Sequence, residues 1–237
     1  EIAATGTGTV VMADINAGVQ GSGANTGISI ENAAVNAGAT TLLLDGGVTM
    51  SAPAAGSSGV SVTQSSATST ADVTVASGVT GTISDAFSGL VVTTQAGGAT
   101  DIDIAGAIAL TGASTGSDVG IGVTHAGQGA LTLDTLGTGT VSIAGSGGDV
   151  DAGDDGIVAT VASGGLNGDL SLTTTADTIA RAGDGVQATQ RGMGATTVSL
   201  DDVQASLTGV SVTNANAASV AATTLTLNGE VTGIGGV

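Results

Sequence analysis

Residues 89–94 read Gly-Leu-Val-Val-Thr-Thr, and residues 120–125 read Gly-Ile-Gly-Val-Thr-His. Both follow one pattern, glycine-apolar-x-apolar-threonine-polar, with Glu31 replacing the threonine in one copy only. The seven copies of this pattern begin at Gly27, Gly59, Gly89, Gly120, Gly156, Gly185 and Gly209. A fixed register at a spacing of about 30 residues is typical of a solenoid, whose units stack and share one continuous core.

Two further strand patterns follow each glycine. The second pattern is an apolar-x-apolar triplet, formed by Leu42/Leu44, Val73/Val75, Ile102/Ile104, Leu131/Leu133, Leu170/Leu172, Val198/Leu200 and Leu225/Leu227. The third pattern is weaker and consists of Val48/Met50, Val79, Ile108/Leu110, Val141/Ile143, Ile179, Val203 and Val231. Alternation with a period of two indicates half-buried strands, and glycine-rich turns separate them. We therefore expect an all-β, right-handed parallel β-helix with three short strands per coil and about seven to eight coils of roughly 30 residues.

The alignment predicts one β-solenoid segment over residues 1–237, as part of a longer chain. Residues 1–26 fit a partial first coil, with Val10/Met12 in its second strand and Val19 in its third. The threonines four residues after each glycine should form an external ladder. One residue later stand Asn32, Gln64, Thr94, His125, Gln190 and Asn214, with Val161 as the exception. We expect these side chains at a coil corner, where stacked amides can hydrogen-bond up and down the column.

The composition indicates a narrow aliphatic interior. The chain contains 42 Gly, a single Phe, and no Trp, Tyr, Cys or Lys, so wide aromatic packing is excluded. Without cysteine there is no disulfide framework, and no apolar run approaches the roughly 20 residues of a membrane helix. The net charge of −18 disfavours nucleic acid and anionic membranes as partners, which need basic patches, and favours divalent cations.

The Gly-Ile/Val-x-Val-Thr strands, separated by Ser-, Gly- and Asp-rich turns with no Lys or Cys, resemble the passenger regions of bacterial autotransporters. They are similar also to filamentous-haemagglutinin-like adhesins. The resemblance spans essentially the whole chain. It implies a right-handed β-helix, display at the bacterial cell surface or outside the cell, and adhesion or self-association. It transfers no site residues.

The best candidate for a metal site is the acidic run at residues 149–155, in the longest repeat. Its carboxylates on a glycine-rich turn, Asp149, Asp151, Asp154 and Asp155, could supply oxygen ligands to Ca²⁺. The alternative, which we favour, is a solvated acidic loop. A second acidic pair, Asp101 and Asp103, should point outward, with Asp101 stacked on Asp72 of the preceding coil; here too we favour a solvated surface.

Two other candidates have ordinary interpretations. His125 is the single histidine, so any Ser-His-Asp triad would need it, but it occupies the polar corner position of its coil. Arg181 and Arg191 are the two basic residues and could bind an anion. We favour surface ion pairing, with Asp177 and Asp184 nearby in the sequence.

These features favour a non-enzymatic, extracellular structural or adhesive segment, whose partner is a cell-surface or matrix ligand or the chain itself. The alternative is a self-assembling subunit of a filament or surface layer, through end-to-end or lateral contacts. A polysaccharide-active enzyme is the third hypothesis. It is disfavoured because such sites combine carboxylates with Arg or Lys and stack sugars on aromatic rings, which this chain lacks.

Overall fold

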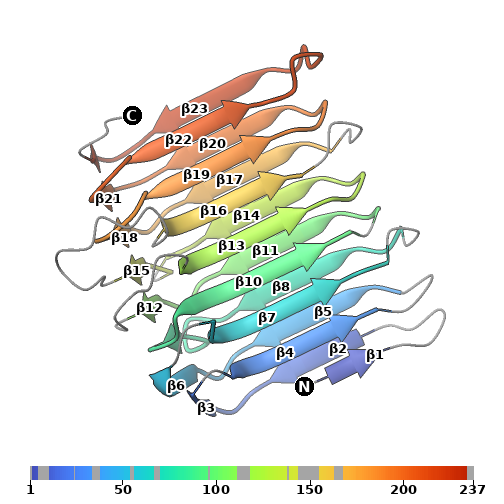
Figure 1. Ribbon diagram of the computed structural model, residues 1–237, viewed down its shortest axis with the longest axis vertical. Coiled ribbons are helices and arrows are strands. Elements are labelled where there is room, and N and C mark those ends of the chain that lie inside the picture. The colour runs from blue at the N-terminus through green and yellow to red at the C-terminus, as the bar shows by residue number, and fades with distance from the viewer. Residues whose placement is uncertain are drawn as a thin grey trace.

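The computed structural model of the chain is a stack of β-strand coils (Figure 1). It describes residues 2–4, 11–23, 25–33, 38–53, 56–66, 70–95, 97–110, 118–137, 139–143, 155–162 and 168–233. None of these residues forms a helix. The described residues accordingly include no helix that is long and apolar enough to span a membrane.

The strands form three parallel sheets of eight strands each, and consecutive strands of one sheet come from consecutive coils. The first sheet contains β1 (Ile2–Ala4), β4 (Thr26–Asn32), β7 (Ser58–Gln64), β10 (Ser88–Thr94), β13 (Val119–His125), β16 (Asp155–Val161), β19 (Val186–Gln190) and β22 (Val210–Asn214). The second contains β2 (Val11–Ile15), β5 (Thr40–Leu44), β8 (Val73–Ser77), β11 (Thr100–Ile104), β14 (Leu131–Thr135), β17 (Leu170–Thr174), β20 (Thr196–Leu200) and β23 (Thr223–Leu227).

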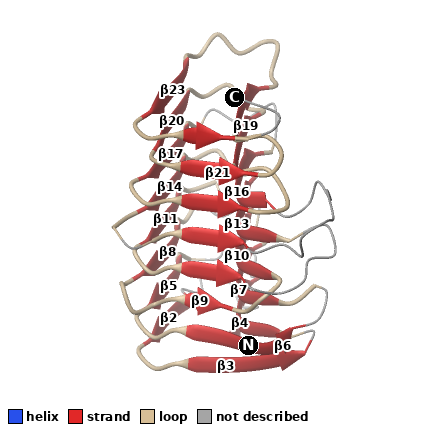
Figure 2. Ribbon diagram, turned by 90° about the vertical axis from the view of Figure 1, so that its left-hand side faces the viewer, coloured by secondary structure: helices blue, strands red, loops and turns tan. Residues whose placement is uncertain are grey.

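The third sheet contains β3 (Val19–Gly23), β6 (Val48–Pro53), β9 (Ile83–Ser84), β12 (Ile108–Leu110), β15 (Val141–Ile143), β18 (Thr178–Ala180), β21 (Val203–Ala205) and β24 (Val231–Thr232). Figure 2 shows these short strands one above another on one side of the stack. The expected parallel β-solenoid with three strands per coil is therefore confirmed. The stack has about six turns, slightly fewer than the seven to eight expected.

The core is a set of aliphatic columns that run along the stack. Equivalent residues pair in register from coil to coil; Leu90, for example, lies between Val60 and Ile121, and all three are buried. Alternate residues of each strand face inward, so a single register places every apolar triplet on the interior side. The first two strand patterns of the sequence are confirmed in this way.

The glycine that begins each repeat lies where the first and third sheets approach each other. A Cβ atom on Gly27 would lie 2.7 Å from Cγ1 of Val48, and one on Gly156 would lie 2.6 Å from Cγ2 of Thr178. Both distances are far below van der Waals contact. The repeated glycine is therefore explained by lack of space at this corner rather than by a left-handed backbone.

The weaker third pattern and the N-terminal coil need corrections. In one coil the third strand is Ile83–Ser84, and Val79 is exposed in the preceding turn. Ile179 lies in the third sheet but faces outward, because its neighbours Thr178 and Ala180 occupy the interior positions. In the first coil the inward residues are Val11 and Ala13, so the predicted Val10/Met12 register was wrong by one residue; Met12 is exposed.

Candidate functional site

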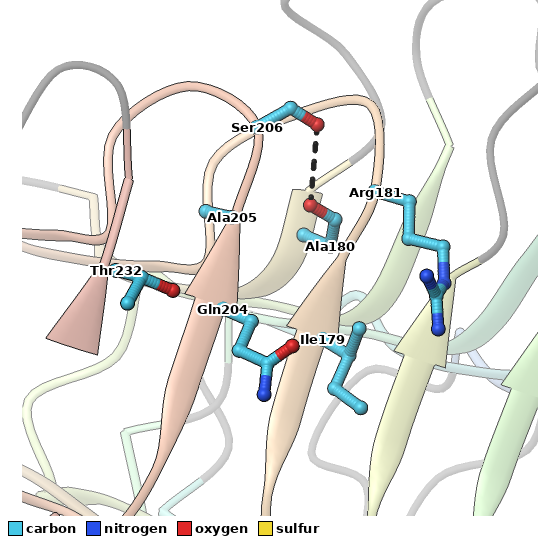
Figure 3. A pocket seen from close by; sticks show the side chains of 7 residues that line it. All are labelled: Ile179, Ala180, Arg181, Gln204, Ala205, Ser206 and Thr232. Atoms are coloured by element: carbon cyan, nitrogen blue, oxygen red, sulfur yellow. Dashed lines mark hydrogen bonds between the residues drawn. The ribbon is translucent and has the colours of Figure 1, made fainter. Parts of the chain in front are cut away.

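A hollow of about 300 Å³ lies on the outer face of the third sheet, near the C-terminal end of the stack (Figure 3). Ile179, Gln204 and Thr232 form its floor, since they occupy consecutive strands in register and their side chains point outward. Arg181 and Ser206, in the turns that follow two of these strands, complete the lining. The stacking of equivalent positions thus places five side chains from three coils around one depression.

The neighbouring hollow, of about 240 Å³, shares Gln204 and Thr232 and adds the carboxylates of Asp202 and Glu230. Oδ1 of Asp202 accepts a hydrogen bond from the backbone N–H of Glu230 at 2.6 Å, so this oxygen belongs to the turn. The two hollows together present amide, hydroxyl, guanidinium and carboxylate groups. Such groups can recognise a polar ligand, but they contain no nucleophile activated by a base.

The surface ion pairing expected for Arg181 and Arg191 stays a prediction. The carboxylate of Asp184 accepts the backbone N–H of Thr208 at 2.7 Å and the Nε2–H of Gln187 at 3.0 Å. One of these hydrogen bonds joins Asp184 to the next coil, and the other joins it to the strand that follows in its own coil.

His125 is the last residue of β13 and lies at the corner between the first and second sheets, with 0% of its surface exposed. Its Nδ1 lies 2.9 Å from the hydroxyl oxygen of Thr100, and its Nε2 lies 2.9 Å from the carbonyl oxygen of Gly129. The corner position expected from the sequence is confirmed. Burial also removes His125 from contact with any substrate in solution, which argues against the triad.

Asn32, Gln64, Thr94 and Gln190 of this polar column are also buried, because positions one, three and five after the glycine share the interior face, whereas Asn214 near the end of the stack is half-buried. Asn32 donates to the hydroxyl of Thr40 at 2.9 Å, and Gln190 donates to the carbonyl of Gly168 and accepts from the N–H of Gly192. These bonds lead to turns and strand starts, not to amides above or below, so the expected amide ladder was wrong for these residues. Strict alternation of the strand would have predicted their burial.

Of the proposed calcium ligands, Asp149, Asp151 and Asp154 lie outside the described residues. Asp155 is described as the first residue of β16, where its Oδ1 accepts the N–H of Asp184 at 3.0 Å and its Oδ2 accepts Nε2–H of Gln187 at 2.9 Å. Within the described part of the chain, no three His, Cys, Asp or Glu side chains gather in a way that could hold a metal ion. The calcium loop therefore stays a prediction.

The second sheet carries an acidic cluster on its outer face, which we define as Asp101, Asp103 and Asp134. Asp103 pairs in register with Asp134, whereas Asp101 pairs with Thr74; the predicted stack of Asp101 on Asp72 was therefore wrong. Desolvation and then the charges of Asp103, Asp134 and Asp72 raise the pKa of Asp101. Desolvation, with a smaller contribution from Asp103, raises the pKa of Asp134 against the lowering effect of a hydrogen bond from Thr173.

Comparisons of the chain with protein-family models, with curated proteins and with solved structures give no match. The assignment of function therefore depends on the fold and on the side chains described above.

Proposed function

We propose that this chain is a non-enzymatic structural and adhesive β-solenoid segment of a surface-displayed or secreted bacterial protein, of the autotransporter or filamentous-haemagglutinin-like kind. The single observation that carries the proposal is the unbroken order of eight parallel strands in each of the three sheets, which makes a long stack. Such a stack can hold a binding surface at a fixed distance from a cell. The sequence resemblance and the cysteine-free composition support this assignment.

The side chains that could perform chemistry support the non-enzymatic part of the proposal. His125 is buried and bonded through both nitrogens, and Asp155 and Asp184 serve the stacking of turns. The hollow beside Gln204 and Arg181 is polar and open, which suits reversible binding of a cell-surface or matrix ligand. Its lining side chains are therefore the ones to alter in a test of adhesion.

The test is adhesion of beads coated with the purified chain to an array of cell-surface glycans and matrix proteins. We expect saturable binding to at least one component, and weaker binding by beads that carry the double variant Arg181→Ala, Gln204→Ala. Thr124→Val, on the first sheet, is the matched control. Turnover of an acidic polysaccharide by the chain, measured as new reducing ends, would contradict the proposal, as would the absence of any binding.

Self-assembly is the second candidate function, and one observation favours it. Leu225 and Leu227 occupy inward positions in β23, in register with Val198 and Leu200, yet 38% and 40% of their surfaces are exposed. A further coil or a second molecule can cover this edge. If molecules join there, sedimentation velocity should show concentration-dependent growth that Leu225→Asn abolishes; a single monomeric species at all concentrations would exclude this route to filaments.

A further inference from the structure

The ring of His125 joins two coils at the corner between the first and second sheets. Thr100, its partner at Nδ1, begins β11 in the preceding coil, and Gly129, its partner at Nε2, lies in the turn that leads into β14. The ring therefore ties the turn at residues 126–130 to the coil below it. Thr100 and His125 are both fully buried.

The contacts assign a neutral ring with its proton on Nε2. The carbonyl oxygen of Gly129 can only accept, so Nε2 must donate to it, and Nδ1 then accepts the hydroxyl proton of Thr100. In this state every polar atom of the ring has a partner. A second proton would add a full positive charge at a site without water contact.

Among the described residues, no carboxylate is placed to compensate such a charge. In the corner turns of the neighbouring coils, Asp72 and Asp169 direct Oδ1 to the backbone N–H groups of Ala99 and Ala195. The titratable groups on the strands packed against His125 are Asp101 and Asp103 of β11, Asp134 of β14 and Asp155 of β16; β10 carries none. The first three face outward by strand alternation. Asp155 begins its strand, six residues from the corner, which is roughly 20 Å along an extended chain.

From this geometry we infer that His125 is an acid-sensitive latch, which holds the turn at residues 126–130 closed when neutral and releases it when protonated. The charged ring gains solvation only if the corner opens, because it has no counter-charge inside. The inference goes beyond the adhesive role proposed above and does not depend on it. Release would change the surface of the stack locally and leave the coils on either side paired.

The direction of the pH dependence follows from burial. Desolvation lowers the pKa of His125, and hydrogen bonds to the backbone at Gly129 and Gly127 oppose it only in part. The open state therefore binds the proton at a higher pH than the closed state does. Above about pH 6.5 the ring is neutral in both states and the turn is held closed most firmly. Below that pH, the equilibrium constant for opening of the turn should rise about tenfold for each unit by which the pH falls, until the lowered pKa of the closed state is reached.

The experiment uses the intact chain and its single histidine. The ring proton resonances of His125 are followed by NMR from pH 8 to 4, and amide hydrogen exchange is measured for peptides that cover residues 119–135 at pH 7.5 and 5. The control variant is His125→Gln, because Gln64 and Gln190 occupy the same column position in other coils. Comparison at equal pH removes the intrinsic pH dependence of exchange, and peptides over residues 196–214 serve as an internal reference.

We expect the ring to titrate below its ordinary value, with protection of residues 119–135 falling at least fivefold in acid relative to His125→Gln and to the reference peptides. A ring that titrates at or above about 6.5 would overturn the inference. So would equal loss of protection in both proteins. If the variant does not fold, the wild-type titration and the internal reference decide the question.

Discussion

The inner polar column of this solenoid and the acidic cluster on the outer face of its second sheet differ in burial, charge and partners. The inner column at the corner, from Asn32 to Gln190, is neutral and buried; Asn32 bonds to the start of a strand and Gln190 bonds to turns. The outer acidic cluster, Asp101, Asp103 and Asp134, is partly exposed and repulsive, and its closest members lie about 4.8 Å apart on paired strands. Because the coils stack in register, side chains at one repeat position lie next to each other along the stack, so their charge or polarity recurs from coil to coil. A neutral side chain that has its own partner can be repeated inside, whereas a charge can be repeated only where water screens it.

The largest expected effect tests the partners of the inner column. Gln190→Leu removes a donor to Gly168 and an acceptor for the N–H of Gly192, and leaves both backbone groups buried without a partner. We expect the free energy of unfolding to fall by about 3 kcal/mol, since each orphaned buried group costs about 1–3 kcal/mol. Urea unfolding at pH 7 measures this value. A loss below about 0.5 kcal/mol would show that the turn finds other partners.

A second substitution in the same column sharpens the test, because Gln64 has only one weak bond. Its Oε1 accepts from the N–H of Ser66 at 3.4 Å, and its Nε2 is buried without a partner. Gln64→Leu therefore loses one long hydrogen bond and also removes an unsatisfied donor. We expect a loss of about 1 kcal/mol or less in urea unfolding. Equal losses at both positions would mean that amide volume, rather than hydrogen bonding, stabilises the corner.

These two residues also show how far the sequence could predict the structure. Strand identity and register followed from the spacing of apolar residues, because one register buries all of them at once. The hydrogen-bond partners of Gln190 and Gln64 could not be predicted, since they depend on which turn carbonyl or N–H points into the corner. The hollow at Gln204 was missed for a similar reason. Its lining comes from three coils, and the inward position of Thr178, which turns Ile179 outward, has no signal in the hydrophobic pattern.

Asp103→Asn tests the outer cluster, and here we expect a gain. The substitution removes a charge that raises the pKa of both Asp101 and Asp134, and it keeps the shape of the side chain. At pH 7 the protein should be more stable to urea by about 0.5 kcal/mol, the size of a like-charge pair across partly exposed strands. Thr132→Asn, on the same sheet face, is the uncharged control. A destabilised Asp103→Asn variant would show that the carboxylate has a favourable partner, such as a cation.

The gain from Asp103→Asn should depend on pH in a direction opposite to that of His125. Asp101 and Asp134, whose pKa values are raised in part by the charge of Asp103, bind their protons more tightly in the folded state, so the repulsion is absent in acid and grows as the pH rises through their folded pKa values. The stability difference between Asp103→Asn and the wild type should therefore shrink from pH 7 toward pH 3. A difference that stays constant over this range would indicate a cause other than charge.

The smallest effect is expected on the outer face of the first sheet, where a neutral ladder replaces the acidic one. Thr124 lies between Thr93 and Thr160 in register and is exposed, as the sequence predicted for the whole threonine row. Thr124→Val keeps the β-branched shape and removes the hydroxyl, so unfolding in urea should change by no more than about 0.5 kcal/mol. A larger loss would mean that hydroxyls bond from coil to coil. The threonine row on the outer face would then depend on specific hydrogen-bond partners, as the buried inner column does. In that case the inner and outer faces would differ only in whether they carry charge.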